Sequence, residues 1–110
     1  MENFNINHLV FNSDGLIPTI AQEKSTNEIL MMAYSNKNSI EMTVKTKKAH
    51  FWSRSKKKLW LKGETSGDKL NITNIYTDCD SDALIYEVEL EGIGACHTGK
   101  KSCFYKKLEL

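Results

Sequence analysis

Most of this 110-residue chain consists of short β-prone runs separated by polar turns, and this pattern limits the folds available to it. GLIPTIAQ and EILMMAY flank the polar turn EKSTN, which predicts a hairpin with Pro18 at a strand start or at a sheet edge. AHFWSR and KLWLKG flank SKKK, which predicts a second hairpin with a lysine-rich tip. Three further runs, LNITNIYT, ALIYEVELEG and CFYKKLEL, are also expected to be strands.

One segment has the spacing of a helix instead. We expect a helix over about residues 37–47, capped by Asn36, with Ile40, Met42 and Val44 on its apolar side. No internal repeat or Gly- and Pro-rich linker divides the chain. The sequence therefore predicts an α+β fold, in which residues 1–110 form one strand-rich domain with one main helix.

The net charge of +1 conceals two oppositely charged segments. Eight basic and no acidic residues lie from Lys45 to Lys62, whereas six acidic and no basic residues lie from Tyr76 to Glu91. The balanced total argues against a general nucleic-acid or membrane binder, and the separate poles suit a small molecule that carries phosphates and a metal. The start of the chain does not resemble a targeting leader, and three cysteines suit a reducing compartment, so we expect the cytoplasm.

The stretch TDCDSDA places three aspartates at alternate positions. In an extended strand Asp78, Asp80 and Asp82 would share one face, and Cys79 would point to the other. Repulsion between the carboxylates calls for a compensating cation such as magnesium, calcium or manganese. The alternative is a solvated acidic turn, which the residue types of this stretch alone favour.

An EF-hand calcium loop is a weaker interpretation of the same stretch. Counting from Asp78 places acidic residues at loop positions 1, 3 and 5 and Glu89 at position 12. Ala83 occupies position 6, where the motif needs a glycine for its sharp turn, and the flanking segments are β-prone instead of helical.

Cys79, Cys96 and Cys103 are candidates for a zinc site. Their spacing matches no standard structural zinc motif, so the functional interpretation is a catalytic zinc with three protein ligands and an open position for water. It is equally open that each thiol is an ordinary small buried group. His97, beside Cys96, is a candidate fourth ligand, a general acid or base, or a surface histidine.

The segment FWSRSKKKLWLKGETSG combines the groups that phosphate oxygens bind, namely hydroxyls, a guanidinium and glycine backbone N–H groups. The candidate substrate-binding residues are Ser53, Arg54, Ser55, Lys62, Thr65 and Ser66. Because Phe51, Trp52 and Trp60 interleave with basic residues, an RNA-binding surface is the competing interpretation. It leaves DCDSD and the cysteines unexplained, and the RNP1 pattern is absent.

Taken in order, FWSRSKKKLWLKGETSG, DCDSDAL and ACHTGKKSCFY resemble the phosphoribosyl-AMP cyclohydrolase family of histidine biosynthesis. With GLIPTIAQ and ILMMAYSN the resemblance covers about residues 14–105. It implies hydrolytic opening of the adenine ring of 1-(5-phosphoribosyl)-AMP at the N1–C6 bond, by a zinc-activated water, to the formimino-carboxamide ribotide. No pyrophosphohydrolase segment follows, and we expect the preceding step to belong to another chain.

The resemblance also implies a role for each matching residue. It makes Cys79, Cys96 and Cys103 zinc ligands, Asp78, Asp80 and Asp82 magnesium ligands, His97 the proton-transfer residue, and the serines, the arginine and the GETSG residues, Glu64 among them, substrate contacts. It further implies an intertwined homodimer that shares zinc between subunits.

Two positions depart from the family pattern. Asp68 stands where His or Asn is usual, and Tyr34 stands where Trp is usual. The alternatives to the cyclohydrolase are a zinc-dependent deaminase-like enzyme acting on a purine nucleotide and a non-enzymatic calcium- or RNA-binding module. The deaminase signature, HxE with PCxxC, is missing from this sequence.

Overall fold

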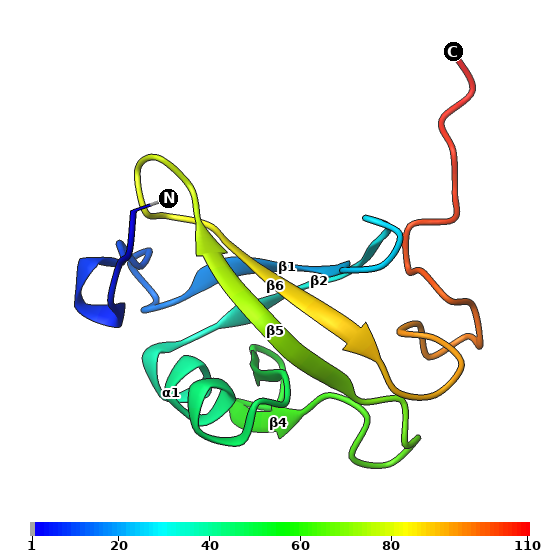
Figure 1. Cartoon of the computed structure of the whole chain (residues 1–110), viewed down its shortest axis with the longest axis horizontal. Coiled ribbons are helices and arrows are strands. Elements are labelled where there is room, and N and C mark those ends of the chain that lie inside the picture. The colour runs from blue at the N-terminus through cyan, green and yellow to red at the C-terminus, as the bar shows by residue number, and fades with distance from the viewer. Residues whose placement is uncertain (1) are drawn as a thin grey trace.

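A mixed four-stranded sheet forms the centre of the molecule, and the computed structural model describes residues 2–110 (Figure 1). The elements are η1 (Ile6–His8), β1 (Ile17–Glu23), β2 (Ile29–Ser35), α1 (Lys37–Thr46), β3 (His50–Ser53), β4 (Lys58–Leu61), β5 (Leu70–Thr77) and β6 (Leu84–Leu90). The main sheet has the order β2-β1-β6-β5, with β1 and β6 parallel and the other neighbours antiparallel, while β3 and β4 form a separate hairpin. The predicted α+β class is confirmed. Neither helix in the described residues has the length and apolar character needed to cross a membrane.

The first predicted hairpin is confirmed as β1 and β2. Ile17 pairs with Ser35, and the register continues to the end of β1 with one irregularity between Ala21 and Gln22. Pro18 is the second residue of β1, and pairing with β6 begins only at the next residue. Its missing N–H therefore falls where β1 has no second neighbour, as expected for a proline at a strand start.

The predicted helix and its cap are confirmed in α1. The Asn36 side chain accepts a hydrogen bond from the Ser39 N–H at 2.8 Å, and the Ser39 hydroxyl accepts one from the Asn36 N–H at 2.9 Å. This reciprocal capping box satisfies N–H groups that the first helical turn leaves free. The helix ends at Lys47, whose φ of 62° is left-handed.

The predicted apolar side of α1 is only partly correct. The buried residues of the helix are Ser39, Ile40 and Thr43. Val44 is instead 44% exposed, and Met42 is half-buried. The Thr43 hydroxyl donates to the Ser39 carbonyl at 2.8 Å and accepts from the His50 N–H at 2.9 Å. Because these hydrogen bonds satisfy the hydroxyl, the helix buries a partly polar face against β3.

The second predicted hairpin, β3 and β4, packs on the sheet through its aromatic residues. Phe51 is fully buried, with its ring centroid 5.4 Å from that of Trp60 and 5.6 Å from that of Tyr86 in β6. His50 is buried and His8 is exposed. The buried aromatics therefore build the core, and β3, β4 and α1 cover one face of the sheet (Figure 1).

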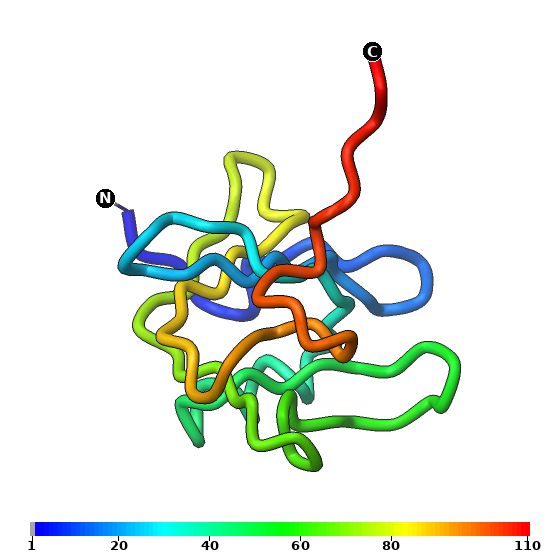
Figure 2. The backbone as a smooth tube through the Cα atoms, turned by 90° about the vertical axis from the view of Figure 1, so that its right-hand side faces the viewer, coloured from blue at the N-terminus to red at the C-terminus, as the bar shows by residue number. Residues whose placement is uncertain are grey.

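The last predicted strand, CFYKKLEL, is wrong. The Cys103 N–H donates to the Leu30 carbonyl at 2.7 Å, and residues 104–110 then extend from the body without regular secondary structure (Figures 1 and 2). Phe104 is 62% exposed and Leu108 is 79% exposed. β-prone residues form a strand only when a partner supplies hydrogen bonds, and nothing within residues 2–110 pairs with this tail.

Candidate active site

The acidic stretch at residues 78–83, which we call the acidic turn, connects β5 to β6 and is not a strand. Ser81 is left-handed, with φ of 63°. The Asp78 Oδ1 atom accepts hydrogen bonds from the N–H groups of Asp82 at 3.0 Å and Ala83 at 3.3 Å. The predicted extended conformation is therefore wrong, because the aspartate side chain competes with a strand ladder for backbone N–H groups.

The three aspartates of the acidic turn nevertheless converge. One carboxylate oxygen from each of Asp78, Asp80 and Asp82 lies within 4.8 Å of the other two, and all three residues are exposed. Hydrogen bonds with Asp78 and Asp80 raise the pKa of Asp82. Desolvation acts to raise the pKa of Asp78, but hydrogen bonds with the other two carboxyls outweigh it and the pKa is lowered. Carboxylates this close resist full ionisation, so the oxygen donors fit a hard divalent cation. The flanking elements are strands, which excludes the helix–loop–helix of an EF-hand.

Cys96 and Cys103, the cysteine pair, lie together in the cysteine loop, residues 91–103, which follows β6. The Thr98 hydroxyl lies 3.0 Å from Cys96 Sγ and, as the largest effect, lowers the pKa of that thiol. Cys103 is exposed as a residue, yet partial burial of its thiol and contact with Cys96 raise its pKa. Two adjoining sulfur donors fit a soft-ligand metal such as zinc.

The third candidate ligand, Cys79, lies far from the cysteine pair. It is exposed in the acidic turn before β6, whereas the pair follows the end of that strand. A seven-residue strand rising about 3.3 Å per residue separates the two positions by roughly 20 Å. Figure 1 shows the turn and the loop at opposite ends of β6. Across residues 2–110 the three thiols thus form no common cluster within one chain.

Asp68 holds the start of the cysteine loop. Its Oδ1 atom accepts a hydrogen bond from the Ile93 N–H at 3.0 Å. Gly92 lies against the same carboxylate with φ of 104°, so a side chain there would be strained and would collide with Asp68. Sequence reasoning identified Asp68 as a departure from the family pattern but missed this anchoring role.

Lys101 holds the end of the cysteine loop. Its Nζ atom lies 2.7 Å from Glu23 Oε1 and 3.2 Å from Glu28 Oε1, and the neighbouring Ser102 hydroxyl donates to the Ile29 carbonyl at 2.6 Å. The hydrogen bond with Lys101 lowers the pKa of Glu23, which is only 8% exposed. Sequence reasoning missed this anchor, because no local pattern links residues so far apart in the chain.

One groove of about 450 Å³ collects most of the predicted catalytic and substrate-binding side chains. It is lined by Ser53, Lys56, Lys58, Trp60, Leu61, Gly63, Glu64, Thr65, Ser66 and His97. His97 comes from the cysteine loop, Ser53 from the end of β3, and the GETSG residues from the loop after β4. Hydroxyls, lysines and the Trp60 ring on one surface suit a phosphorylated molecule that carries an aromatic base.

The remaining predicted substrate residues lie outside this groove. Arg54 stacks on Tyr34 of β2, with its guanidinium 4.2 Å from the ring centroid. Ser55 is at the hairpin tip, where its hydroxyl lies 3.5 Å from that of Ser53. Lys62 lies close enough to the cysteine pair for its charge to favour both ionised thiols.

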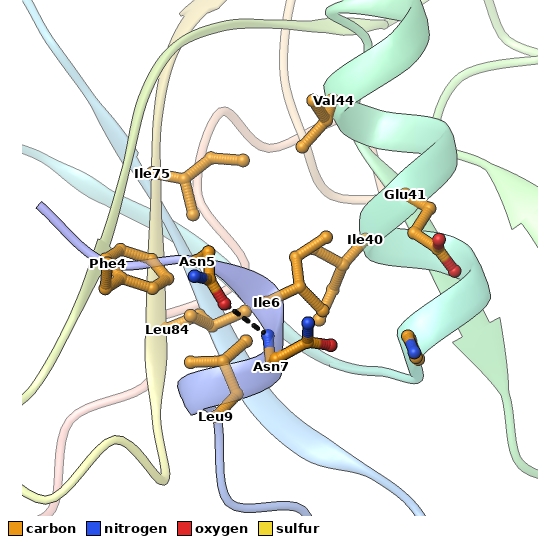
Figure 3. A pocket seen from close by; sticks show the side chains of 11 residues that line it. Phe4, Asn5, Ile6, Asn7, Leu9, Ile40, Glu41, Val44, Ile75 and Leu84 are labelled. Carbon is orange, nitrogen blue, oxygen red and sulfur yellow. Dashed lines mark hydrogen bonds between the residues drawn. The ribbon is translucent and has the colours of Figure 1, made fainter.

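Two larger grooves lack the combination of hydroxyls, lysines and a tryptophan ring. Figure 3 shows an apolar groove of about 620 Å³ between the N-terminal segment, α1 and β5, in which Ile40 and Val44 face Phe4 and Ile75. None of its lining residues is a predicted site residue, and its apolar walls would leave phosphate oxygens unpaired. Another, of about 760 Å³, lies along β5 beside Cys79.

Comparisons with known proteins identify the family of this chain. A sequence model of the family described as phosphoribosyl-AMP cyclohydrolase matches residues 31–105. The phosphoribosyl-AMP cyclohydrolase of Archaeoglobus fulgidus is 56% identical over 101 residues, 92% of this chain and 93% of that protein. That of Methanoregula boonei is 52% identical over 92% of this chain and 81% of its own length. The histidine biosynthesis bifunctional protein HisIE of Aquifex aeolicus is 50% identical, and this chain spans 49% of it. With a match over most of its length and relatives this similar, the chain belongs to the phosphoribosyl-AMP cyclohydrolase family.

Proposed function

We propose that this chain catalyses hydrolytic opening of the adenine ring of phosphoribosyl-AMP in histidine biosynthesis, with zinc and magnesium as cofactors. The names of its relatives supply the substrate and the pathway. The observation that carries the proposal for this chain is the groove in which His97 meets Ser53 and the GETSG residues. In this groove a bound phosphorylated nucleotide would lie next to His97, the proposed proton-transfer group.

The cysteine pair and Cys79 are the zinc ligands in this proposal. Zinc held by three protein ligands supplies Lewis acidity that makes a water molecule a stronger nucleophile near neutral pH. Thr98 fixes the orientation of the Cys96 sulfur, and the charge of Lys62 favours the thiolate forms that a metal needs.

Asp78, Asp80 and Asp82 are the magnesium ligands in this proposal. Their converging oxygens form the hard donor set that magnesium prefers, and the backbone hydrogen bonds of Asp78 hold the turn in shape. A cation held here would offset the charge of the substrate phosphates next to the carboxylates.

The side chains of the groove then perform the remaining tasks. Water adds to C6 of the adenine ring, the N1–C6 bond breaks, and N1 receives a proton. His97 takes the proton from the attacking water and returns it to N1, the role of a general base and then of a general acid. The hydroxyls of Ser53, Thr65 and Ser66 donate to phosphate oxygens, and Glu64 accepts from the ribose. Arg54 and Ser55 contact a phosphate that extends past the hairpin tip.

The proposed active enzyme is a homodimer. Cys79 and the cysteine pair lie at opposite ends of β6, so one zinc ion can reach all three thiols only if two chains supply them. The three free cysteines also suit reducing conditions, and the cytoplasm remains the expected compartment.

A direct assay tests the proposal. Purified protein supplied with zinc and magnesium is expected to convert phosphoribosyl-AMP, which ultraviolet absorbance follows. The matched control Cys103→Ser is expected to lose zinc and turnover together while its circular dichroism spectrum is unchanged. Folded protein that holds both metals and leaves the substrate intact would contradict the proposal. Release of ammonia without ring opening would favour a deaminase-like activity instead.

A further inference from the structure

We infer that Tyr34 is a positioning residue for substrate phosphate, because its ring holds the Arg54 guanidinium where it can bind a phosphate monoester. The phosphate belongs to the substrate of the proposed function, on which the identity of the ligand rests. Tyr34 lines none of the grooves described above, so its ring acts on the ligand through Arg54.

Arg54 is the only arginine among the 15 basic residues of the chain. A guanidinium is planar and carries N–H donors along its edges, in a fork that matches two oxygens of one phosphate. An ammonium is a compact point charge without that fork. Lysine supplies the charge at every other basic position, including Lys56, Lys57 and Lys58 beside Arg54. The single arginine therefore indicates that shape as well as charge matters at this position.

The stacked geometry leaves the donor edges of Arg54 open. Its Cζ atom lies over the Tyr34 ring, 4.2 Å from the centroid, so the ring contacts the flat face of the guanidinium. Arg54 is exposed, and no carboxylate among residues 2–110 forms an ion pair with it. The N–H donors at its edges are thus left for an acceptor from outside the chain, and a phosphate fits their fork.

Tyr34 belongs to the sheet, whereas Arg54 belongs to a projecting turn. Tyr34 pairs with Pro18 of β1, and the next residue, Ser35, is buried with its hydroxyl 2.8 Å from that of Thr19. Arg54 begins the turn at the tip of the β3–β4 hairpin, which projects from the body of the molecule (Figure 2). The ring therefore ties a side chain of the projecting tip to the sheet.

This contact orders the Arg54 side chain before the ligand arrives. A free arginine side chain loses the freedom of several rotatable bonds when its donors bind phosphate. Stacking on the ring removes part of that freedom in advance, so the bound form is favoured more strongly. The gain applies to the bound substrate and the transition state alike, and it is therefore expected in KM and not in kcat.

The position of Arg54 suits the second phosphate of the proposed substrate. Ser53 lines the groove that contains His97, while Arg54, the next residue, lies outside it. 1-(5-Phosphoribosyl)-AMP carries two phosphate monoesters, each on its own ribose. The hydroxyls of the groove bind one of them in the proposed function, and Arg54 binds the other past the hairpin tip.

A titration with ribose 5-phosphate tests the binding role without turnover. Because the chain has one arginine, nuclear magnetic resonance of the full chain with zinc and magnesium gives one arginine Nε–H resonance, and it belongs to Arg54. Ribose 5-phosphate is expected to shift this resonance. Tyr34→Leu is expected to raise the Kd about two- to fivefold, the range of a cation–π contact at an exposed site. Tyr34→Phe and Tyr34→Trp keep a ring and are expected to bind at least nearly as tightly as the unmodified chain.

Two results of the titration would overturn the inference. The first is an Arg54 resonance that ribose 5-phosphate leaves unshifted. The second is an equal loss of affinity in Tyr34→Phe and Tyr34→Leu, which would assign the effect to the tyrosine hydroxyl instead of the ring. Circular dichroism checks that each variant is folded, and half-buried Tyr34 leaves no core cavity when it is shortened.

Steady-state kinetics with phosphoribosyl-AMP tests whether Tyr34 acts through Arg54. Arg54→Gln is expected to raise KM roughly 10- to 100-fold, the range for hydrogen bonds to a charged group. Tyr34→Leu is expected to raise KM further in the unmodified chain only, because the ring has no guanidinium to hold in Arg54→Gln. The matched control Lys45→Gln removes the same charge from an exposed position of α1 and is expected to leave KM unchanged.

The outcomes separate this inference from the proposed function. A chain that turns over phosphoribosyl-AMP with the same KM in Tyr34→Leu, or in which the two changes raise KM independently, would overturn the role of Tyr34 and leave the proposed function standing. A chain that binds ribose 5-phosphate through Arg54 and Tyr34 but leaves phosphoribosyl-AMP intact would contradict the proposed function while the positioning role held.

Discussion

His97 is the side chain on which the proposed chemistry depends most directly. It is exposed in the groove with Ser53 and Trp60, so a bound substrate can reach it. We expect His97→Ala to lower kcat by about 10²–10⁴-fold, the usual contribution of a general acid or base, with a smaller change in KM. Steady-state kinetics measures this, and added imidazole is expected to restore part of the rate. A variant with unchanged kcat would assign the proton transfer to another group.

Asp68 shows how one side chain can fix a loop that carries proposed ligands. The Asp68→Ala change removes the acceptor for the Ile93 N–H, and we expect the free energy of unfolding to fall by about 1–2 kcal/mol. Asp68→Asn retains an oxygen acceptor for the Ile93 N–H and is expected to change stability less. Denaturant unfolding of the metal-free protein measures both. Equal losses in the two variants would rule out the hydrogen bond as the cause.

Lys101 and Glu23 form an anchor whose effect depends on pH. The pKa of Glu23 is lowered from 4.5 by Lys101 and then by Thr26, while Glu28 also faces the lysine. A lowered carboxyl pKa stabilises the fold above the unfolded value, and this contribution is lost as pH falls through the folded value. Because Lys101 is 41% exposed, solvent screens the ion pair, and we expect Lys101→Met to lower the free energy of unfolding only modestly at pH 7.

The pH dependence supplies the check on this anchor. The difference between Lys101→Met and the unmodified chain is expected to shrink below about pH 4.5. Lys101→Arg, which keeps the charge, is expected to unfold like the unmodified chain. A difference that is constant from pH 7 to pH 3 would mean that the ion pair does not account for the loss.

Among the elements, the acidic turn combines a structural task with the proposed metal site. Asp78 accepts two backbone hydrogen bonds, whereas the Asp80 side chain makes no such bond within the described residues. We therefore expect Asp80→Asn to weaken magnesium binding alone, and Asp78→Ala to weaken magnesium binding and destabilise the turn. Isothermal titration calorimetry and hydrogen exchange of the turn amides measure the two effects. Equal protection of those amides in both variants would contradict the division of roles.

The elements also show what the sequence can predict. The two hairpins, the helix and its Asn36 cap follow from residues adjacent in the chain, so local patterns suffice for them. The acidic stretch has the period of a strand, but the hydrogen bonds that the Asp78 carboxylate accepts and the left-handed conformation of Ser81 fold it into a turn. The tail has strand composition, but no strand among residues 2–110 pairs with it. Local patterns cannot show that a partner strand is absent.

The candidate site also contains some features that local motifs predict and others that they cannot predict. The motifs predict the residue types of the proposed metal and substrate sites, and Ser53 and His97 line one groove. The anchors through Asp68 and Lys101 join segments far apart in sequence, so no spacing rule indicates them. The separation of Cys79 from the cysteine pair becomes visible only once β6 is known to run between them.

The two ends of β6 carry different parts of the proposed metal sites. Each chain has a cysteine pair at one end of β6 and Cys79 with the three aspartates at the other end. Neither end alone offers three thiols. The proposed zinc site therefore requires the opposite end of a second chain.

Subunit complementation tests whether two chains together build the zinc site. Chains with Cys79→Ser and chains with Cys96→Ser are each expected to bind little zinc and to be inactive. After equal mixing and exchange, half of the dimers are mixed, and in each mixed dimer one of two sites has all its thiols, so about a quarter of the unmodified activity and zinc content should return. No recovery after verified exchange, or full zinc binding by either variant alone, would contradict a site built from two chains.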